Sequence, residues 1–171
     1  MKMLTTQIAG LLQRIATNHE EEIEDTARLL AQAVVGEGRV VLVGTNELNG
    51  IVINAIEGAE SFTNATRFSK DLELGTMDRV WLFTRSSVDI EALEIARDLA
   101  KQNVAFAVVA SEKATEENEL SELADIYIST GILKGLLPND EGGRVVEPHL
   151  LASLFVYEAV KLSFDEMLLD L

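Results

Sequence analysis

Four short segments of the chain are apolar with almost no polar alternation, and stretches with helical spacing lie between them. The apolar segments are residues 40–43, 80–83, 104–110 and 126–128. A β-strand has this composition when both faces of its sheet are covered, as in a parallel sheet flanked by helices. The pattern therefore predicts an α/β fold with right-handed crossovers.

The stretch between the first two apolar segments is longer than one crossover helix requires. It has room for a helix over about residues 48–59 and a short strand near residues 65–68. Residues 90–101 and 116–124 predict two further crossover helices. With five strands, the usual parallel order is 2-1-3-4-5. We therefore expect a three-layer, flavodoxin-like sandwich, in which helices flank a parallel five-stranded sheet.

Two helices are expected before the first strand. The first has an apolar face made by Leu4, Ile8, Leu11, Leu12 and Ile15. The second is expected to begin near Asn18, because Asn18 and Glu21 have the spacing of a capping box. Gly36 and Gly38 are expected to end it.

The last helix, expected from about Pro148, is apolar almost all round, and such a helix must be covered on most sides. Its own domain supplies one side. A partner subunit can supply the rest, so the pattern predicts a homo-oligomer, a dimer or tetramer, assembled through the first and last helices.

The length of 171 residues fits one domain. Within it we expect N-terminal helices at residues 1–36, an α/β core at residues 39–130, a loop at residues 131–147 and a C-terminal helix at residues 148–171. The loop is rich in Gly, Pro, Asn and Asp, and its length is typical of a functional or mobile segment.

The charge balance excludes several partners. The chain has 14 basic and 29 acidic residues, a formal net charge of −15, whereas nucleic acids and anionic membranes require a basic surface. The absence of cysteine removes disulfides and thiolate metal sites. The two histidines, His19 and His149, are far apart in sequence, so neither a metal nor another cofactor is predicted. No signal peptide or spanning segment is evident, which leads us to expect a cytoplasmic protein.

In an open α/β sheet, ligands bind beyond the carboxyl ends of the strands, where the strand order reverses. Here that point lies between residues 44–50 and residues 84–89. In the second loop, hydroxyls and one guanidinium precede a helix start, which suits an anion such as phosphate. The alternative is simple helix capping, because Ser86 and Asp89 have capping-box spacing and Asp89 would repel an anion.

Three segments together resemble the sugar isomerase (SIS) domain family over most of the chain. They are RVVLVGTNELNGIVINAIEGAE, DRVWLFTRSSVDIEALEIARDLAKQ and ELADIYIST, which look like the family's first strand with its glycine loop, its phosphate loop with the following helix, and its last strand. The single-domain phosphoheptose isomerase type is the nearest match. The chain also resembles a small bacterial group of SIS-like proteins without an assigned activity.

The resemblance implies site residues that are only partly kept. Substrate-binding positions fall on Thr45, Asn46, Asn49, Thr84, Arg85, Ser86, Ser87 and Asp89, and catalytic positions fall on Glu57 as base and His149 as acid, with Glu147 as the other acid candidate. The phosphate-binding serine of the glycine loop becomes Leu48, which cannot donate a hydrogen bond. Glu47 adds a negative charge beside the implied phosphate.

These differences favour a SIS-like protein that binds a sugar phosphate or similar small anion and has a degenerate catalytic centre. One alternative is an active aldose–ketose sugar-phosphate isomerase that uses Glu57 as its base. A second alternative is a structural oligomer with a vestigial cleft.

Overall fold

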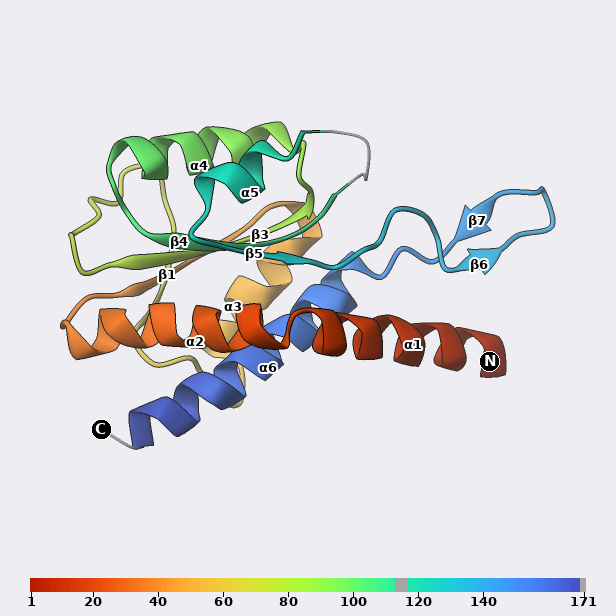
Figure 1. Ribbon diagram of the computed structural model, residues 1–171, viewed down its shortest axis with the longest axis horizontal. Coiled ribbons are helices and arrows are strands. Elements are labelled where there is room, and N and C mark those ends of the chain that lie inside the picture. Colours follow the sequence, from red (N-terminus) through yellow and green to blue (C-terminus); the bar gives the residue numbers. More distant parts are fainter. Residues whose placement is uncertain (113–116, 170–171) are drawn as a thin grey trace.

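Within residues 1–112 and 117–169, which the computed structural model describes, a five-stranded parallel sheet forms the central layer (Figure 1). Its spatial order is β2-β1-β3-β4-β5, so the predicted order is confirmed. The strands are β1 (Val40–Gly44), β2 (Ala65–Arg67), β3 (Arg79–Ser86), β4 (Phe106–Ser111) and β5 (Ile126–Ser129). Each neighbouring pair is parallel.

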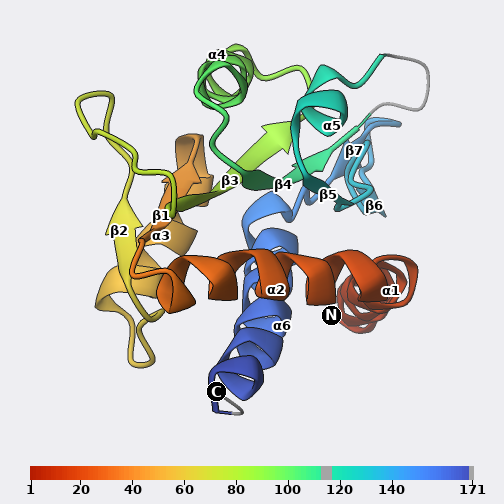
Figure 2. The same ribbon diagram turned by 60° about the vertical axis from the view of Figure 1, so that its left-hand side comes forward.

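Helices cover both faces of the sheet, as Figures 1 and 2 show. One face packs against α4 (Ile90–Lys101) and α5 (Glu119–Leu123), and the other against α1 (Lys2–Asn18), α2 (Glu20–Val35), α3 (Asn49–Glu57) and α6 (His149–Leu169). Alternate strand residues serve the two cores. In β1, for example, Val40 and Leu42 face α2 and α6, whereas Val41 and Val43 face α4. This two-sided burial explains why the strands lack polar alternation.

Helix α6 is held on the sheet by aromatic packing. Tyr157 stacks on Trp81 of β3 with ring centroids 5.8 Å apart, and Phe164 lies 4.3 Å from the ring of Phe62. All four rings are buried. Helix α6 also packs along α2. Among the described residues, no helix is long and apolar enough to cross a membrane.

Two details differ from the sequence-based expectations, and a third expectation lies outside the described residues. The capping box at Asn18 is wrong, because Asn18 is the last residue of α1 and α2 begins at Glu20, with His19 between them and no side-chain cap. The expected loop at residues 131–147 contains a small antiparallel hairpin, β6 (Leu137–Pro138) with β7 (Arg144–Val145). The expected start of a helix at residue 116 lies outside the described residues, and α5 is described from Glu119.

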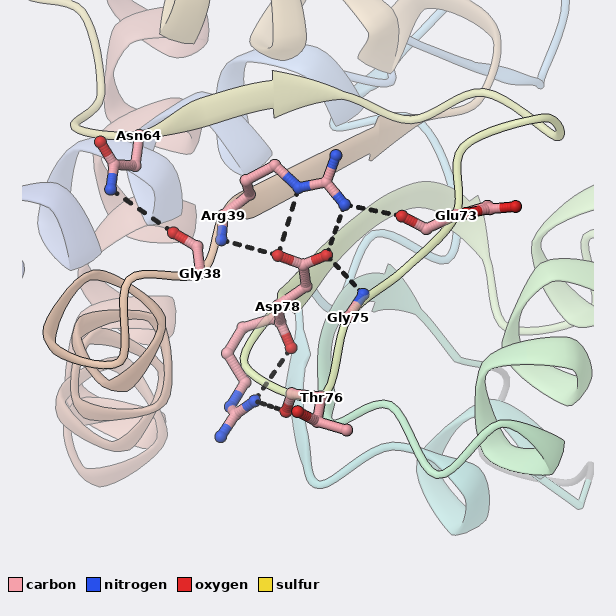
Figure 3. Close-up of polar contacts among 8 residues, drawn as sticks. Gly38, Arg39, Asn64, Glu73, Gly75, Thr76 and Asp78 are labelled. Carbon is pink, nitrogen blue, oxygen red and sulfur yellow. Dashed lines mark hydrogen bonds and ion pairs between the residues drawn. The ribbon is translucent and has the colours of Figure 1, made fainter.

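A buried carboxylate joins the amino ends of β1 and β3 (Figure 3). Asp78 accepts hydrogen bonds from the backbone N–H and the guanidinium of Arg39, at 2.8 Å and 2.6 Å, and from the backbone N–H of Gly75 at 2.8 Å. Burial raises the pKa of Asp78, but these hydrogen bonds outweigh it and hold the pKa below its usual value. This contact lies at the amino ends of the strands, whereas the predicted site lies at their carboxyl ends. We therefore assign Asp78 a structural role.

Candidate functional site

Two threonines join the loops at the point where the strand order reverses. Thr45 follows β1 and Thr84 lies near the end of β3, and their hydroxyl oxygens are 3.0 Å apart. Both are almost completely buried. The Thr45 hydroxyl also lies 3.3 Å from a carboxylate oxygen of Asp89. The two loops that the sequence predicted to form a ligand crevice are therefore in direct contact.

The loop after β1 is a tight turn. It runs through a short 3-10 helix, η1 (Asn46–Leu48), before α3 begins. A Cβ atom at Gly44 would lie 2.4 Å from the carbonyl oxygen of Leu48, so only glycine fits this position. Asn46 has a left-handed backbone (φ 51°) and is exposed at the crevice. Leu48 is fully buried and provides no polar group to the crevice.

Asp89 caps α4 with its own side chain. One carboxylate oxygen accepts the backbone N–H of Ala92 at 3.0 Å. Ser86 makes a local turn instead, where its hydroxyl accepts the N–H of Val88 at 3.3 Å. The expected capping box led by Ser86 is therefore wrong, because the helix starts three residues later. The backbone N–H of Ser87 donates to the carbonyl of Ser111 on β4 at 2.8 Å.

A charged pair joins the two loops. The Nε atom of Arg85 donates to both carboxylate oxygens of Glu47, at 2.7 Å each. This hydrogen bond holds the pKa of Glu47 below its usual value. Both side chains are partly exposed. The guanidinium that the sequence predicted to bind an anion is therefore already engaged by a carboxylate.

The first residue of α6 brings an imidazole to the same cluster. His149 lies near Glu47 and Arg85, and its Nε2 atom is 3.8 Å from Glu147. Burial lowers the pKa of His149, although the carboxylates of Glu147 and Glu47 act in the opposite direction. The net effect is that the pKa of His149 lies below its usual value.

Glu57 lies apart from this cluster. It is the last residue of α3, exposed to solvent, and about 12 Å along the helix from Asn49, at roughly 1.5 Å per residue. Its catalytic role stays a prediction. The two loops and the segment before α6 thus bring three carboxylates, those of Glu47, Asp89 and Glu147, near one arginine, Arg85.

A cavity of about 210 Å³ adjoins this crevice at the carboxyl ends of β1 and β2. Its lining includes Gly44 and Asn49 from the first loop, and Arg67 and Lys70 from the segment at the end of β2. The amide oxygen of Asn49 accepts a hydrogen bond from Arg67 Nη1 at 2.6 Å. Sequence reasoning missed both cations, although their position just after a strand at the reversal point was a usable signal.

The family model described as "Domain of unknown function (DUF2529)" matches residues 1–168. The chain belongs to the DUF2529 family. It is also 34% identical over 169 residues to the uncharacterized protein YwjG of Bacillus subtilis, covering 98% of this chain and 97% of that relative. The family match thus extends over the crevice and over the cavity beside it.

Solved structures with the same fold place this DUF2529 chain among SIS-domain folds. A candidate phosphosugar isomerase involved in capsule formation from Bacteroides fragilis has a TM-score of 0.67 at 17% identity, over 96% of this chain and 91% of that one. Phosphoheptose isomerase from Neisseria gonorrhoeae has a TM-score of 0.62 at 10% identity, over 95% of each chain. The NanR protein of Vibrio vulnificus, complexed with ManNAc-6P, has a TM-score of 0.57 at 14% identity, over 95% of this chain and 65% of that one. These likenesses establish the SIS-like fold.

Proposed function

We propose that this DUF2529 chain binds a small phosphorylated carbohydrate at the crevice between the loops after β1 and β3, without turning it over. The observation that carries the proposal is the meeting of Thr45 and Thr84 at 3.0 Å where the strand order reverses. That position is where open α/β sheets bind their ligands. Side-chain hydroxyls, and side-chain amides such as those of Asn46 and Asn49, can form hydrogen bonds with the hydroxyls of a sugar.

The fold supports a carbohydrate ligand. The same fold occurs in isomerases of phosphosugars and in a protein that was solved with ManNAc-6P. One fold therefore serves both enzymes and a protein holding a sugar phosphate, and function must be argued from the site.

The residues of the crevice argue against turnover. An aldose–ketose isomerisation needs a base beside the substrate carbon, whereas Glu57 is exposed at the far end of α3. Leu48 is buried where the family resemblance implies a phosphate-binding serine. Asp89 already occupies an amide of the α4 start, and a carboxylate at that position opposes a phosphate.

The primary experiment is a thermal-shift panel of hexose, heptose and amino-sugar phosphates at millimolar concentration. A ligand that binds only the folded chain raises the melting temperature. At a concentration of 100 times its Kd, it raises the free energy of unfolding by about 2.7 kcal/mol. The matching unphosphorylated sugars serve as controls. If no compound in the panel shifts the melting temperature, the binding proposal fails.

The isomerase alternative is favoured by one observation, the half-buried His149 beside Glu147 and Glu47. It is tested with any sugar phosphate that binds, by following exchange of its C2 proton with deuterated solvent by NMR. Exchange that Glu57→Gln abolishes, with binding retained, would establish the isomerase reading with Glu57 as base. We expect no exchange.

Self-association through the first and last helices remains part of the proposal. Several apolar side chains of these helices are exposed, among them Met3, Leu151 and Leu162, at 61%, 43% and 64%. A second copy that packs against them would remove this surface from water. Sedimentation at micromolar concentration measures the oligomer.

A further inference from the structure

The charges around the crevice leave its own loops poorly suited to the anionic end of a ligand. The α4 start is capped by Asp89, whose carboxylate accepts the N–H of Ala92 at 3.0 Å. The Arg85 guanidinium is engaged by Glu47. A phosphate placed on this loop would have to displace one carboxylate and lie beside another, and like charges at such distances repel.

The cavity beside the crevice has the opposite character. Arg67 and Lys70 both line it, and Glu91 is the single carboxylate in its lining. Among the ion pairs formed by the residues that the structure describes, none includes Arg67 or Lys70. In a chain with a formal net charge of −15, a cavity with an excess of uncommitted cations is a specific local feature.

A hydrogen bond also holds the Arg67 side chain in place. Asn49 accepts from Nη1 of Arg67 at 2.6 Å and so fixes the guanidinium on the cavity wall. A guanidinium has five N–H donors in a planar fork, and one bond to Asn49 leaves donors for two oxygens of a phosphate. Asn49 therefore acts as a positioning residue for Arg67.

The size of the cavity fits one end of a ligand. Whole small-molecule sites have volumes of roughly 300 to 1,000 Å³, whereas this cavity has about 210 Å³. Gly44 and Asn49, which line the cavity, also belong to the loop after β1, so the rest of a ligand held here by its anionic group would lie beside that loop.

We propose that the phosphate group of the ligand binds in the cavity at the end of β2, between Arg67 and Lys70, and not on the Ser86 loop before α4. This inference rests on the proposed sugar-phosphate function for the identity of the ligand. The proposal of an anion site does not depend on the sugar, because it is argued from the cavity and its two cations alone.

The test compares Arg67→Gln and Lys70→Gln with the matched control Lys101→Gln, which removes a lysine that is 76% exposed on α4. Far-UV circular dichroism and the melting temperature without ligand check that each variant is folded. The dissociation constant of the best sugar phosphate is then measured by calorimetry. Loss of a charge-assisted hydrogen bond should weaken binding about tenfold in each cavity variant and leave Lys101→Gln unchanged.

The variant Ser86→Ala tests the competing location. If it weakens binding while Arg67→Gln and Lys70→Gln bind like the wild type, the phosphate lies on the loop before α4 and the inference is overturned. Loss of binding only in the cavity variants supports it.

The two proposals fail in different ways. Inorganic phosphate and pyrophosphate serve as probes that need no sugar. If no sugar phosphate binds but pyrophosphate raises the melting temperature of the wild type and not of Arg67→Gln, the anion site holds and the sugar-phosphate function fails. If neither probe nor any sugar phosphate shifts the wild type, both proposals are overturned.

Discussion

Arg85 and Glu47 hold each other across the reversal point of the sheet, with the arginine Nε atom 2.7 Å from each carboxylate oxygen. The two residues come from different loops, one after β1 and one at the end of β3. The pair is neutral by itself, and the carboxylates of Asp89 and Glu147 lie near it. Because Glu47 already binds the Arg85 guanidinium, this cation is not free to bind an anionic ligand.

Glu47→Gln should change ligand affinity more than stability. The side chains of the pair are 51% and 36% exposed, so breaking it should alter the free energy of unfolding by less than about 1 kcal/mol. Removal of a nearby negative charge should strengthen sugar-phosphate binding, on the order of fivefold. Urea unfolding and calorimetry measure the two effects. The control Glu60→Gln removes an exposed carboxylate elsewhere, and equal gains in both variants would contradict a local role.

Asp89→Ala should destabilise the chain by about 1 kcal/mol, because it removes the N-cap of α4. Asp89→Asn keeps a capping side chain and should stay within a few tenths of a kcal/mol of the wild type. Urea denaturation at neutral pH is the measurement. Equal stabilities of Asp89→Ala and wild type would show that the hydrogen bond to Ala92 does not cap the helix in solution.

His149 should make the chain less stable in mild acid. Burial lowers its pKa in the folded state, so the unfolded chain binds more protons as the pH falls through the ordinary value of about 6.5. Stability that is present above that value is then lost toward lower pH. The variant His149→Gln should show a weaker pH dependence between about pH 7 and 5.

The shift itself can be measured directly. In the His19→Gln background, His149 is the one remaining histidine, so its ring signals in an NMR titration are unambiguous. A value at or above 6.5 would contradict the prediction.

Asp78→Asn should be the most destabilising of these substitutions. The carboxylate is 5% exposed and accepts from Arg39 and Gly75, and charge-assisted hydrogen bonds to a buried group are worth about 2 to 3 kcal/mol when one partner is lost. The loss is measured by urea unfolding. Asp98→Asn, at a side chain 68% exposed, is the control and should be nearly neutral.

Leu162→Glu should abolish self-association if α6 forms the proposed contact between copies. Leu162 is 64% exposed, so a charge there costs the isolated chain little and would be buried in the oligomer. Sedimentation at micromolar concentration measures the assembly. Leu133→Glu, at a leucine 58% exposed outside the helices, is the matched control. A monomeric wild type would contradict the oligomer itself.

The architecture was predictable from the sequence because strands that are buried on both faces are continuously apolar. Residues 40–43 of β1, 80–83 of β3 and 106–110 of β4 are apolar without alternation, and the lengths of the intervening segments allow few topologies. The order 2-1-3-4-5 was predicted because it is the usual order for such a chain, and the structure has this order. The short strand β2 was predicted from the room available.

The tertiary structure decided what the site residues do. Whether Ser86 or Asp89 caps α4 depends on where the helix begins, which a three-residue spacing does not fix. The hydrogen bonds between Arg85 and Glu47 join residues 38 positions apart. Arg67 at the end of β2 likewise meets Asn49 at the start of α3. Such contacts depend on side-chain rotamers and on the distance between loops. Local sequence therefore determined the sheet and the point where its strand order reverses, and long-range packing determined which charges at that point are paired and which are not.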